Sequence, residues 1–431
     1  MDRLLQEDLD KRRLQHLYRT RVRVDSACSD QLSVDGKLVH NFCSNDYLGL
    51  ANNTVIANAF KKGIDDCGTG SGASHLISGH SKAHCDLEQQ LAEFIGRPKA
   101  LLFSSGYMAN MGVIAALAGR GDTVLEDYLN HASLLDGGLL SRAKFQRYKH
   151  KNCIDLEAKL NASCSARKLV VTDGVFSMDG DLAPVVELAN VCQNTNAWLM
   201  VDDAHGFGVL GNTGAGLVEE LGLGVDQVPI LMGTLGKAFG TYGAFVAGTE
   251  TLIETLVQFS RSYIYTTAPP PAVAIATSAS LELVKKEQWR RDKLKQLIVR
   301  FRAGAEQIGL SLMHSNTPIQ PVLMESDTQL LETNNKLLEC GFMVGAIRPP
   351  TVPEGTGRLR ITLSASQCLH SVHRLPRWLP CGHGRTSFPE RRATTPCTKS
   401  DGRPSRQPMR LLHTRHRHGP VCAVDANSAA R

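Results

Sequence analysis

The sequence predicts an α/β fold, with a large domain built on a mainly parallel sheet between helices and a smaller C-terminal α/β domain. Short apolar runs alternate with amphipathic helical patterns from about residue 85 to residue 250, as in parallel sheets covered on both faces. At 431 residues, the chain exceeds the usual size of one domain. Its 42% hydrophobic and 21% charged residues are ordinary for a globular protein.

The expected elements follow this division. Leucines at roughly helical spacing among charges predict an amphipathic helix over about residues 1–20, and the runs RVRV and KLVHNF complete an N-terminal segment, residues 1–46. The large domain is expected over residues 47–275, with the strands ALLFS, DTVLED, RKLVVTDGVF, AWLMVDDA, PILMGTL and GAFVAG. The small domain is expected over residues 276–366, with a helix over residues 280–309 and the strands PIQPVLM, FMVGAI and RLRITLSA.

Residues 367–431 show neither the helical nor the strand pattern of apolar residues. They carry eleven Arg and one Lys against three acidic residues, a net charge of +9. The whole chain carries +6, so the first 366 residues carry −3, which removes the electrostatic basis for a nucleic-acid-binding body. The tail also holds six His and four Cys, but their spacing matches no zinc pattern, and no metal is expected. A disordered basic extension and a frame-shifted or misassembled end both stay open, and the abrupt onset favours the second.

The sequence also bounds the location of the protein. No apolar run approaches the ~18–20 residues that a membrane helix needs, and the charged start does not resemble a signal peptide. The twelve cysteines include no CxxC pair and are expected to be reduced thiols. We therefore expect a cytosolic protein with no membrane partner.

The motif TLGKAFG places Lys237 directly after the apolar run PILMG. A lysine among small residues at the end of a buried strand is suited to a lowered pKa and to imine formation with an aldehyde. WLMVDDAHGFG similarly places Asp202, Asp203 and His205 after a strand. A carboxylate can keep the pyridine nitrogen of pyridoxal phosphate protonated, and Asp202 is the predicted partner. The alternatives are a lysine that caps a turn and a structural salt bridge.

Three further motifs carry polar groups beyond apolar runs. In SSGYMAN, free amides of Gly106 and Tyr107 at a helix start are suited to a phosphate, although a plain helix cap has the same pattern. His131, in NHASLLDG, could stack on a flat ring or be a core histidine. In VFSMDGD, the hydroxyl of Ser177 could contact a ring or substrate, or belong only to a turn.

The glycine-rich segment GTGSGASHLISGHS lacks both the GK[ST] of a phosphate loop and a preceding strand, so we expect a flexible loop that faces substrate. AIRPPTVPEGTGRLRITL offers Arg348, Thr351, Arg358 and Arg360, and a guanidinium recognises a carboxylate bidentately. Arg358 and Arg360 share a strand face, and spacing does not separate them.

The motifs SNDYLGLA, GSGASHLISGHSKAH, SSGYMAN, NHASLLD, DGVFSMDGD, VDDAHGFGVLG, TLGKAFG, IYTTAPPP and IRPPTVPEGTGRLRITLSA occur in this order over roughly residues 1–366. Together they resemble the α-oxoamine synthases. The resemblance implies a fold-type I pyridoxal-phosphate-dependent acyltransferase that is a homodimer with shared active sites. DDAHGFG, GHSKAH and IRPPTVP most resemble members that condense L-alanine with a pimeloyl thioester of coenzyme A or acyl carrier protein in biotin synthesis. Another member that uses glycine and acetyl-CoA is the alternative.

The resemblance also implies residue roles. Lys237 is implied as the Schiff-base lysine and proton shuttle, Asp202 as the partner of the pyridine nitrogen, and His205 as the partner of the ring oxygen. The further implied cofactor contacts are His131, by stacking, Gly106, Tyr107, Ser177 and Thr234, with Thr266 or Thr267 reaching the phosphate of the neighbouring subunit. The implied substrate contacts are Arg19, Thr351, Arg348 and Arg360, of which Arg360 is favoured for the carboxylate.

The end of the chain departs from the family. The α-oxoamine synthases close with a helix rich in Leu and acidic residues, where this chain has SASQCLHSVHRLP. This difference is expected to leave apolar surface of the small domain uncovered.

Overall fold

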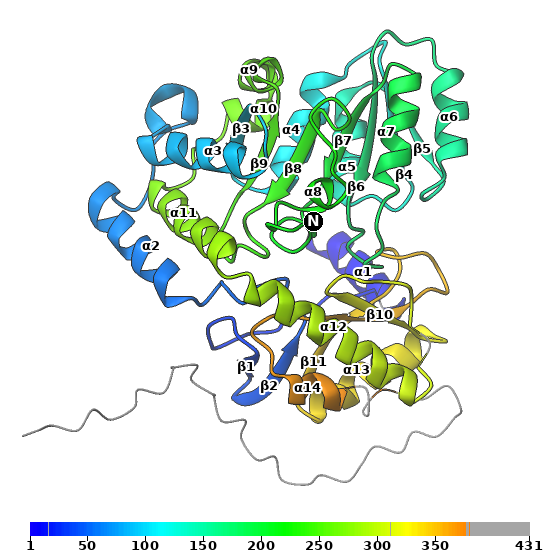
Figure 1. Cartoon of the computed structure of the whole chain (residues 1–431). Coiled ribbons are helices and arrows are strands. Elements are labelled where there is room, and N and C mark those ends of the chain that lie inside the picture. The colour runs from blue at the N-terminus through cyan, green and yellow to red at the C-terminus, as the bar shows by residue number, and fades with distance from the viewer. Residues whose placement is uncertain (16, 311, 376–378, 380–431) are drawn as a thin grey trace, which may run out of the picture. The chain divides into compact units, whose positions relative to one another are not determined.

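The computed structural model describes residues 1–15, 17–310, 312–375 and 379 (Figure 1). Its strands form two sheets. The larger has seven strands in the order β3-β9-β8-β7-β6-β4-β5. Strand β9 is antiparallel to both of its neighbours, and the other described pairs are parallel. The strands are β3 (Lys99–Phe103), β4 (Thr123–Asp127), β5 (Lys144–Tyr148), β6 (Lys168–Asp173), β7 (Trp198–Asp202), β8 (Ile230–Thr234) and β9 (Ala244–Gly248).

Helices cover both faces of this sheet, because successive residues of each strand point to opposite sides. In β6, Leu169 and Val171 pack into one hydrophobic cluster, and Val170 between them packs into another. The first cluster includes residues of α4 (Gly106–Leu117), α5 (Ala132–Ser141), α9 (Glu250–Phe259) and α10 (Arg261–Ile264). The second includes residues of α6 (Cys153–Asn161), α7 (Val185–Asn194) and α8 (Leu217–Glu220). Figure 1 shows α4 and α5 on one side of the sheet and α6 and α7 on the other.

A further layer of helices lies beside β3. These are α2 (Thr54–Cys67), the one-turn η1 (His75–Gly79), α3 (Lys82–Phe94) and α11 (Pro271–Lys286). Helix α11 packs along α2 and α3, and Gly63 allows the close approach, since a Cβ there would lie 2.9 Å from Ala272 Cα. The expected domain boundary between residues 275 and 276 falls within α11.

The second sheet joins the two ends of the described chain. It has five strands in the order β1-β2-β11-β12-β10. The N-terminal strand β2 pairs in parallel with β11, so that His40 lies opposite Phe342. Its strands are β1 (Gln31–Val34), β2 (Lys37–Phe42), β10 (Ile319–Leu323), β11 (Phe342–Ile347) and β12 (Arg358–Thr362). The helices α12 (Trp289–Gln307) and α13 (Asp327–Glu339) belong to the same part of the chain.

Of the helix and the RVRV strand predicted at the N-terminus, the strand is absent and the helix is present. RVRV does not form a strand, and its Val24 makes an isolated bridge to Val34. The predicted N-terminal helix is present as α1 (Asp2–Leu14), with every residue exposed to solvent. Its exposed leucines include Leu4, Leu5 and Leu14. In the described part of the chain, no helix is both long and apolar enough to cross a membrane.

The chain continues regularly past Ser366, contrary to the expectation from periodicity. Cys368 caps the start of helix α14 (Leu369–Arg374), and its sulfur accepts a hydrogen bond from the Ser371 amide at 3.4 Å. Val372, Leu375 and Leu379 are buried in a third hydrophobic cluster, which includes Leu297 and Phe301 of α12, and α14 packs on α12. Six residues are too few for a periodic signal, yet these apolar side chains are buried against the small domain. The disorder or frameshift predicted for the rest of the tail falls on residues 376–378 and 380–431, outside the described residues.

Candidate active site

Polar side chains gather at the carboxyl ends of β6, β7 and β8, where ligands bind in open parallel sheets. They surround a cavity of about 190 Å³. Eight of the predicted cofactor residues line it: Gly106, Tyr107, His131, Ser177, Asp202, His205, Thr234 and Lys237. The other lining residues are Asn110, Ser133, Asp173, Ala204 and Met232.

Lys237 extends from the turn after β8, and its Nζ lies 2.9 Å from His205 Nε2. The side chain is partly exposed through the cavity and otherwise enclosed by protein. Burial lowers the pKa of Lys237 to about 8, although the nearby carboxyl groups of Asp202 and Asp173 oppose this shift. About a tenth of the amine is therefore unprotonated, and nucleophilic, at pH 7, far more than for a lysine with the usual pKa.

His205 connects Lys237 to a residue that the sequence analysis did not assign. Its Nδ1 lies 2.6 Å from the hydroxyl of Tyr47, which is fully buried. Burial, and then the positive charges of Lys237 and Arg360, hold the pKa of His205 well below its usual range, so the ring is neutral. Nε2 can then accept from Lys237, while Nδ1 donates to Tyr47. Tyr47 belongs to SNDYLGLA, which was quoted as a motif but given no chemical role.

Asp202 ends β7 and is held by two hydrogen bonds. Its Oδ2 accepts from Asn110 Nδ2 at 2.7 Å, and its Oδ1 accepts from the Ala204 amide at 2.9 Å. Asp173 lies opposite Asp202 in the register of β6 and β7. Burial, reinforced by the charge of Asp202, raises the pKa of Asp173 well above its usual range, so Asp173 is the carboxyl that holds a proton. Asp173 ends an apolar run as Asp202 does, and that shared signal could have identified it.

The start of α4 has the properties predicted for an anion site. Ser105 caps the helix, and its Oγ accepts from the Met108 amide at 3.3 Å. Within the described residues, no acceptor is bonded to the amides of Gly106 and Tyr107. A Cβ on Gly106 would lie 3.3 Å from Met232 Cε, so the absence of a side chain keeps this wall of the cavity open. Free amides at the positive end of a helix favour a phosphate.

His131 caps α5, with Nδ1 2.8 Å from Ser133 Oγ, and its ring meets the ring of Tyr107 edge-on at 6.3 Å. Burial lowers its pKa, although the charge of Asp202 opposes this effect. The ring is thus largely uncharged at the cavity wall. This position agrees with the stacking role that was expected of His131 but does not test it.

The structure separates Arg358 from Arg360. Arg358 is buried in an ion pair with Asp179. Arg360 is placed by three contacts: Nε donates to the Ser177 carbonyl at 2.6 Å, Nη1 to Thr362 Oγ1 at 2.8 Å, and Nη2 to Asn45 Oδ1 at 3.2 Å. Its charge contributes to the lowered pKa values of Lys237 and His205, so it lies close to the reactive amine.

The other predicted contacts lie away from the cavity lining within the described chain. Arg19, Thr267 and Thr351 are exposed, and Arg348 is half-buried after β11. Thr267 forms an isolated bridge with Ser74 in the glycine-rich segment. None of these residues is among those that line the cavity, and their expected roles stay predictions.

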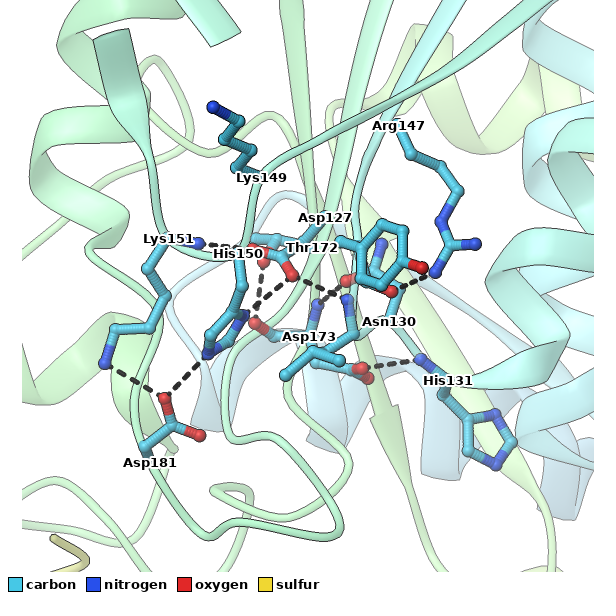
Figure 2. A network of polar contacts seen from close by, with 12 residues as sticks. Asp127, Asn130, His131, Arg147, Lys149, His150, Lys151, Thr172, Asp173 and Asp181 are labelled. Atoms are coloured by element: carbon cyan, nitrogen blue, oxygen red, sulfur yellow. Dashed lines mark hydrogen bonds and ion pairs between the residues drawn. The ribbon is translucent and has the colours of Figure 1, made fainter. Parts of the chain in front are cut away.

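A polar network supports the loops beside the cavity (Figure 2). The imidazole of His150 lies between two carboxylates, with Nδ1 2.8 Å from Asp127 Oδ1 and Nε2 3.0 Å from Asp181 Oδ2. On the side nearer the cavity, Asp173 Oδ2 accepts from the His131 amide at 2.7 Å. Burial alone would lower the pKa of His150, but the hydrogen bonds and charges of Asp127 and Asp181 outweigh it and raise the pKa to about 9.

This charged histidine predicts a pH-dependent stability. The folded pKa of about 9 exceeds the usual histidine pKa of 6.5, so the stabilisation is fully present below the unfolded pKa and is lost as pH rises through about 9. We expect His150→Gln to lower the free energy of unfolding by on the order of 3 kcal/mol near neutral pH and by progressively less above about pH 9. Urea unfolding of both proteins across this range measures the difference. A difference that stays constant with pH would contradict the assignment.

A family model described as Aminotransferase class I and II matches residues 37–375. The 8-amino-7-oxononanoate synthase of Nitrosococcus oceani is 59% identical over 368 residues, which are 85% of this chain and 98% of that protein. The chain belongs to the 8-amino-7-oxononanoate synthase family. The predicted relationship to the α-oxoamine synthases is thereby confirmed.

Solved structures agree with membership of the 8-amino-7-oxononanoate synthase family. The synthase of that name from Francisella tularensis has a TM-score of 0.70 and 31% identity, over 79% of this chain and 96% of that chain. A serine palmitoyltransferase from S. paucimobilis, solved with bound PLP-myriocin, has a TM-score of 0.82 and 29% identity, over 87% and 95%. The fold is that of the fold-type I enzymes, as predicted.

The cavity of this family member fits pyridoxal phosphate by the chemistry of its donor groups. It combines an amine with a lowered pKa, a buried carboxylate and a helix start with free amides. Asn110 Oδ1 is a buried acceptor beside the cavity that has no hydrogen-bond partner in the described structure. An aldehyde, a pyridine nitrogen and a phosphate would each find a complementary group.

Proposed function

We propose that this chain uses pyridoxal phosphate to condense L-alanine with a pimeloyl thioester, forming 8-amino-7-oxononanoate, CO2 and the free thiol. The observation that carries the proposal is 59% identity to a synthase of that name along 98% of its length. The cavity supports it, since Lys237, Asp202 and His205 line the same space. Biotin synthesis is the pathway to which this product belongs.

The cofactor, when bound, withdraws electrons from the substrate carbon next to the amino group. The residues of this chain are proposed to hold it and to move protons. Lys237 Nζ binds the cofactor aldehyde, later takes the α-proton of alanine, and returns a proton after CO2 has left. His205, held by Tyr47, accepts a hydrogen bond from Lys237 Nζ and so fixes the direction of the amine.

The remaining lining residues are proposed to orient the cofactor. Asp202, fixed by Asn110 and the Ala204 amide, keeps the pyridine nitrogen protonated. The amides of Gly106 and Tyr107 bind the phosphate, and the ring of His131 stacks on the cofactor. Ser177 and Thr234 supply hydroxyl groups at the cavity wall.

We propose Arg360 as the partner of the alanine carboxylate. Arg360→Lys keeps the charge but loses the planar fork, so KM for alanine should rise about 10- to 100-fold, as expected for a weakened charged hydrogen bond. Arg358→Lys is the matched control, because Arg358 lies on the same strand but pairs with Asp179. The control should lower the unfolding midpoint and leave KM unchanged. Equal changes in KM in both variants would refute the assignment to Arg360.

The proposed reaction is tested by measuring thiol release with alanine, glycine and serine, each against pimeloyl-CoA and acetyl-CoA. Alanine with pimeloyl-CoA should be the preferred pair, with 8-amino-7-oxononanoate detected by mass spectrometry. A preference for glycine with acetyl-CoA would instead identify the alternative α-oxoamine synthase activity. Replacing pimeloyl-CoA by pimeloyl-acyl carrier protein in the same assay compares the two acyl donors.

Several expectations stay predictions. A homodimer with shared active sites agrees with the exposed leucines of α1, and Thr266 and Thr267 are not among the residues that line the cavity of their own chain. A cytosolic location and the division at residues 47–275 and 276–366 also stay predictions. The mass of the protein in solution, measured by light scattering, tests the dimer.

A further inference from the structure

Three histidines gather outside the cavity described above, in a part of the chain that the proposed reaction does not use. His75 lies in η1, His80 follows it, and His84 lies in the first turn of α3. One ring nitrogen from each lies within 4.8 Å of the other two. His75 Nδ1 and His80 Nδ1 are 2.8 Å apart. Aromatic packing fixes the group, since the ring of His75 stacks on Tyr263 at 4.7 Å.

The second nitrogen of two of these rings faces an oxygen atom. His84 Nε2 donates to the Pro269 carbonyl at 2.8 Å, which leaves its Nδ1 as the atom with a lone pair. His80 Nε2 lies 3.7 Å from the carboxylate Oε2 of Glu88. Metal-binding histidines commonly donate their other N–H to a carbonyl or carboxylate, as His84 does, which orients the ring and raises its basicity. His80 Nδ1 faces His75 Nδ1 at 2.8 Å, and Nδ1 is the acceptor nitrogen of His84.

The rings are also in the protonation state that a metal requires. Burial lowers the pKa of all three histidines, that of His75 to about 3, so each ring is neutral at physiological pH. His75 and His84 are buried, while the His80 side chain keeps 27% of its exposure. Leu76 and Ile77 beside the cluster are exposed, so an ion could enter from this side.

We propose that His75, His80 and His84 bind a zinc ion through three imidazole nitrogens, with water as the fourth ligand. Three neutral imidazoles suit zinc and its neighbours in the transition series better than calcium or magnesium, which prefer oxygen. A neutral imidazole carries one N–H whether or not it binds a metal, so the proton between His75 Nδ1 and His80 Nδ1 moves to Nε2 of its own ring when the ion binds, and no proton is released. His84 Nδ1 exchanges its hydrogen bonds from the Ser81 amide and the Ser81 hydroxyl, each 3.0 Å long, for the metal.

The site would add to contacts that already join the glycine-rich segment to the residues before α11. Ser71 Oγ already donates to the Pro269 carbonyl at 2.6 Å, and the Ala268 amide donates to the Ala73 carbonyl at 3.0 Å. A metal would add a cross-link between this segment and α3. The ion would add to the contacts that already hold this segment, which was predicted to be a flexible substrate-facing loop.

Cobalt(II) is the probe for this site, because it replaces zinc and absorbs visible light according to its coordination. The pyridoxal-phosphate-loaded, full-length protein is titrated with Co²⁺ alone. We expect one equivalent with the intense absorption of four-coordinate cobalt, and no sulfur-to-cobalt charge-transfer band. His80→Ala should weaken this binding by more than the ~10- to 100-fold that losing an outer-shell partner costs. His80 is chosen because it is the most exposed of the three, so its loss disturbs folding least.

The matched control is His314→Ala, since His314 is exposed and lies outside the cluster. It should bind cobalt as the parent protein does. Equal cobalt binding in His80→Ala and the parent, a sulfur charge-transfer band, or an absence of stoichiometric binding in the parent would each overturn the proposal. The cofactor absorption, followed in the same spectra, shows whether the active site is intact.

Discussion

Lys237→Ala should abolish the covalent cofactor adduct and lower kcat at least about 10³-fold, the largest effect that we expect of any single substitution. The amine is the nucleophilic nitrogen at the cavity, 2.9 Å from His205, and alanine offers neither the imine bond nor the proton transfer. Borohydride reduction followed by mass spectrometry measures the adduct. Thiol release under saturating substrates measures kcat.

The control for this substitution is Lys82→Ala, on the exposed face of α3. It should keep both the adduct and the activity. Far-UV circular dichroism of Lys237→Ala should match the parent protein, because the removed side chain reaches into a cavity and makes no core packing contact that the fold needs. An adduct of unchanged yield on Lys237→Ala would show that a different amine binds the cofactor.

Asp202→Asn should lower kcat about 10²- to 10⁴-fold while the cofactor stays bound. Asparagine preserves the shape and can still accept from the Asn110 amide, but it carries no negative charge to hold the pyridine nitrogen protonated. The measurement is kcat, together with the cofactor absorption spectrum, which reports the protonation state of the ring.

Asp203→Asn is the matched control for this prediction. Asp203 is adjacent and equally buried, but its Oδ2 accepts from the Leu217 amide at 2.6 Å and serves the loop after β7. Burial raises the pKa of Asp203 well above its usual range, so a neutral amide is a near match for it. We expect lower thermal stability and little change in kcat. If the two variants lost activity equally, the charge of Asp202 would not be the cause.

Much of the site could be predicted because the fold places it by a general rule. Asp202, Thr234 and Lys237 each follow an apolar run, and the carboxyl ends of parallel strands meet at one edge. The order of the motifs then indicated a known family, which the comparisons confirm. Both steps depend on local sequence alone.

The predictions that failed, and the features that were missed, depend on pairing or packing. Strands β1 and β5 were not predicted. Strand β5 lies at the edge of its sheet, and its polar residues conceal the alternation of apolar and polar residues that marks a strand. RVRV looked like a strand but pairs through one bridge. Helix α14 is short, and the burial of Val372 and Leu375 against distant segments stabilises it.

The contacts around Lys237 show the same limit. Tyr47, Asn110 and Asp173 come from separate segments of the chain and meet at the cavity only after folding. The sequence by itself determined the fold class, the family and which side chains follow buried strands, because these depend on periodicity and motif order. Only the tertiary structure decided which arginine lies near the amine and which tyrosine holds His205. Those choices depend on long-range register and burial, which neighbouring residues do not encode.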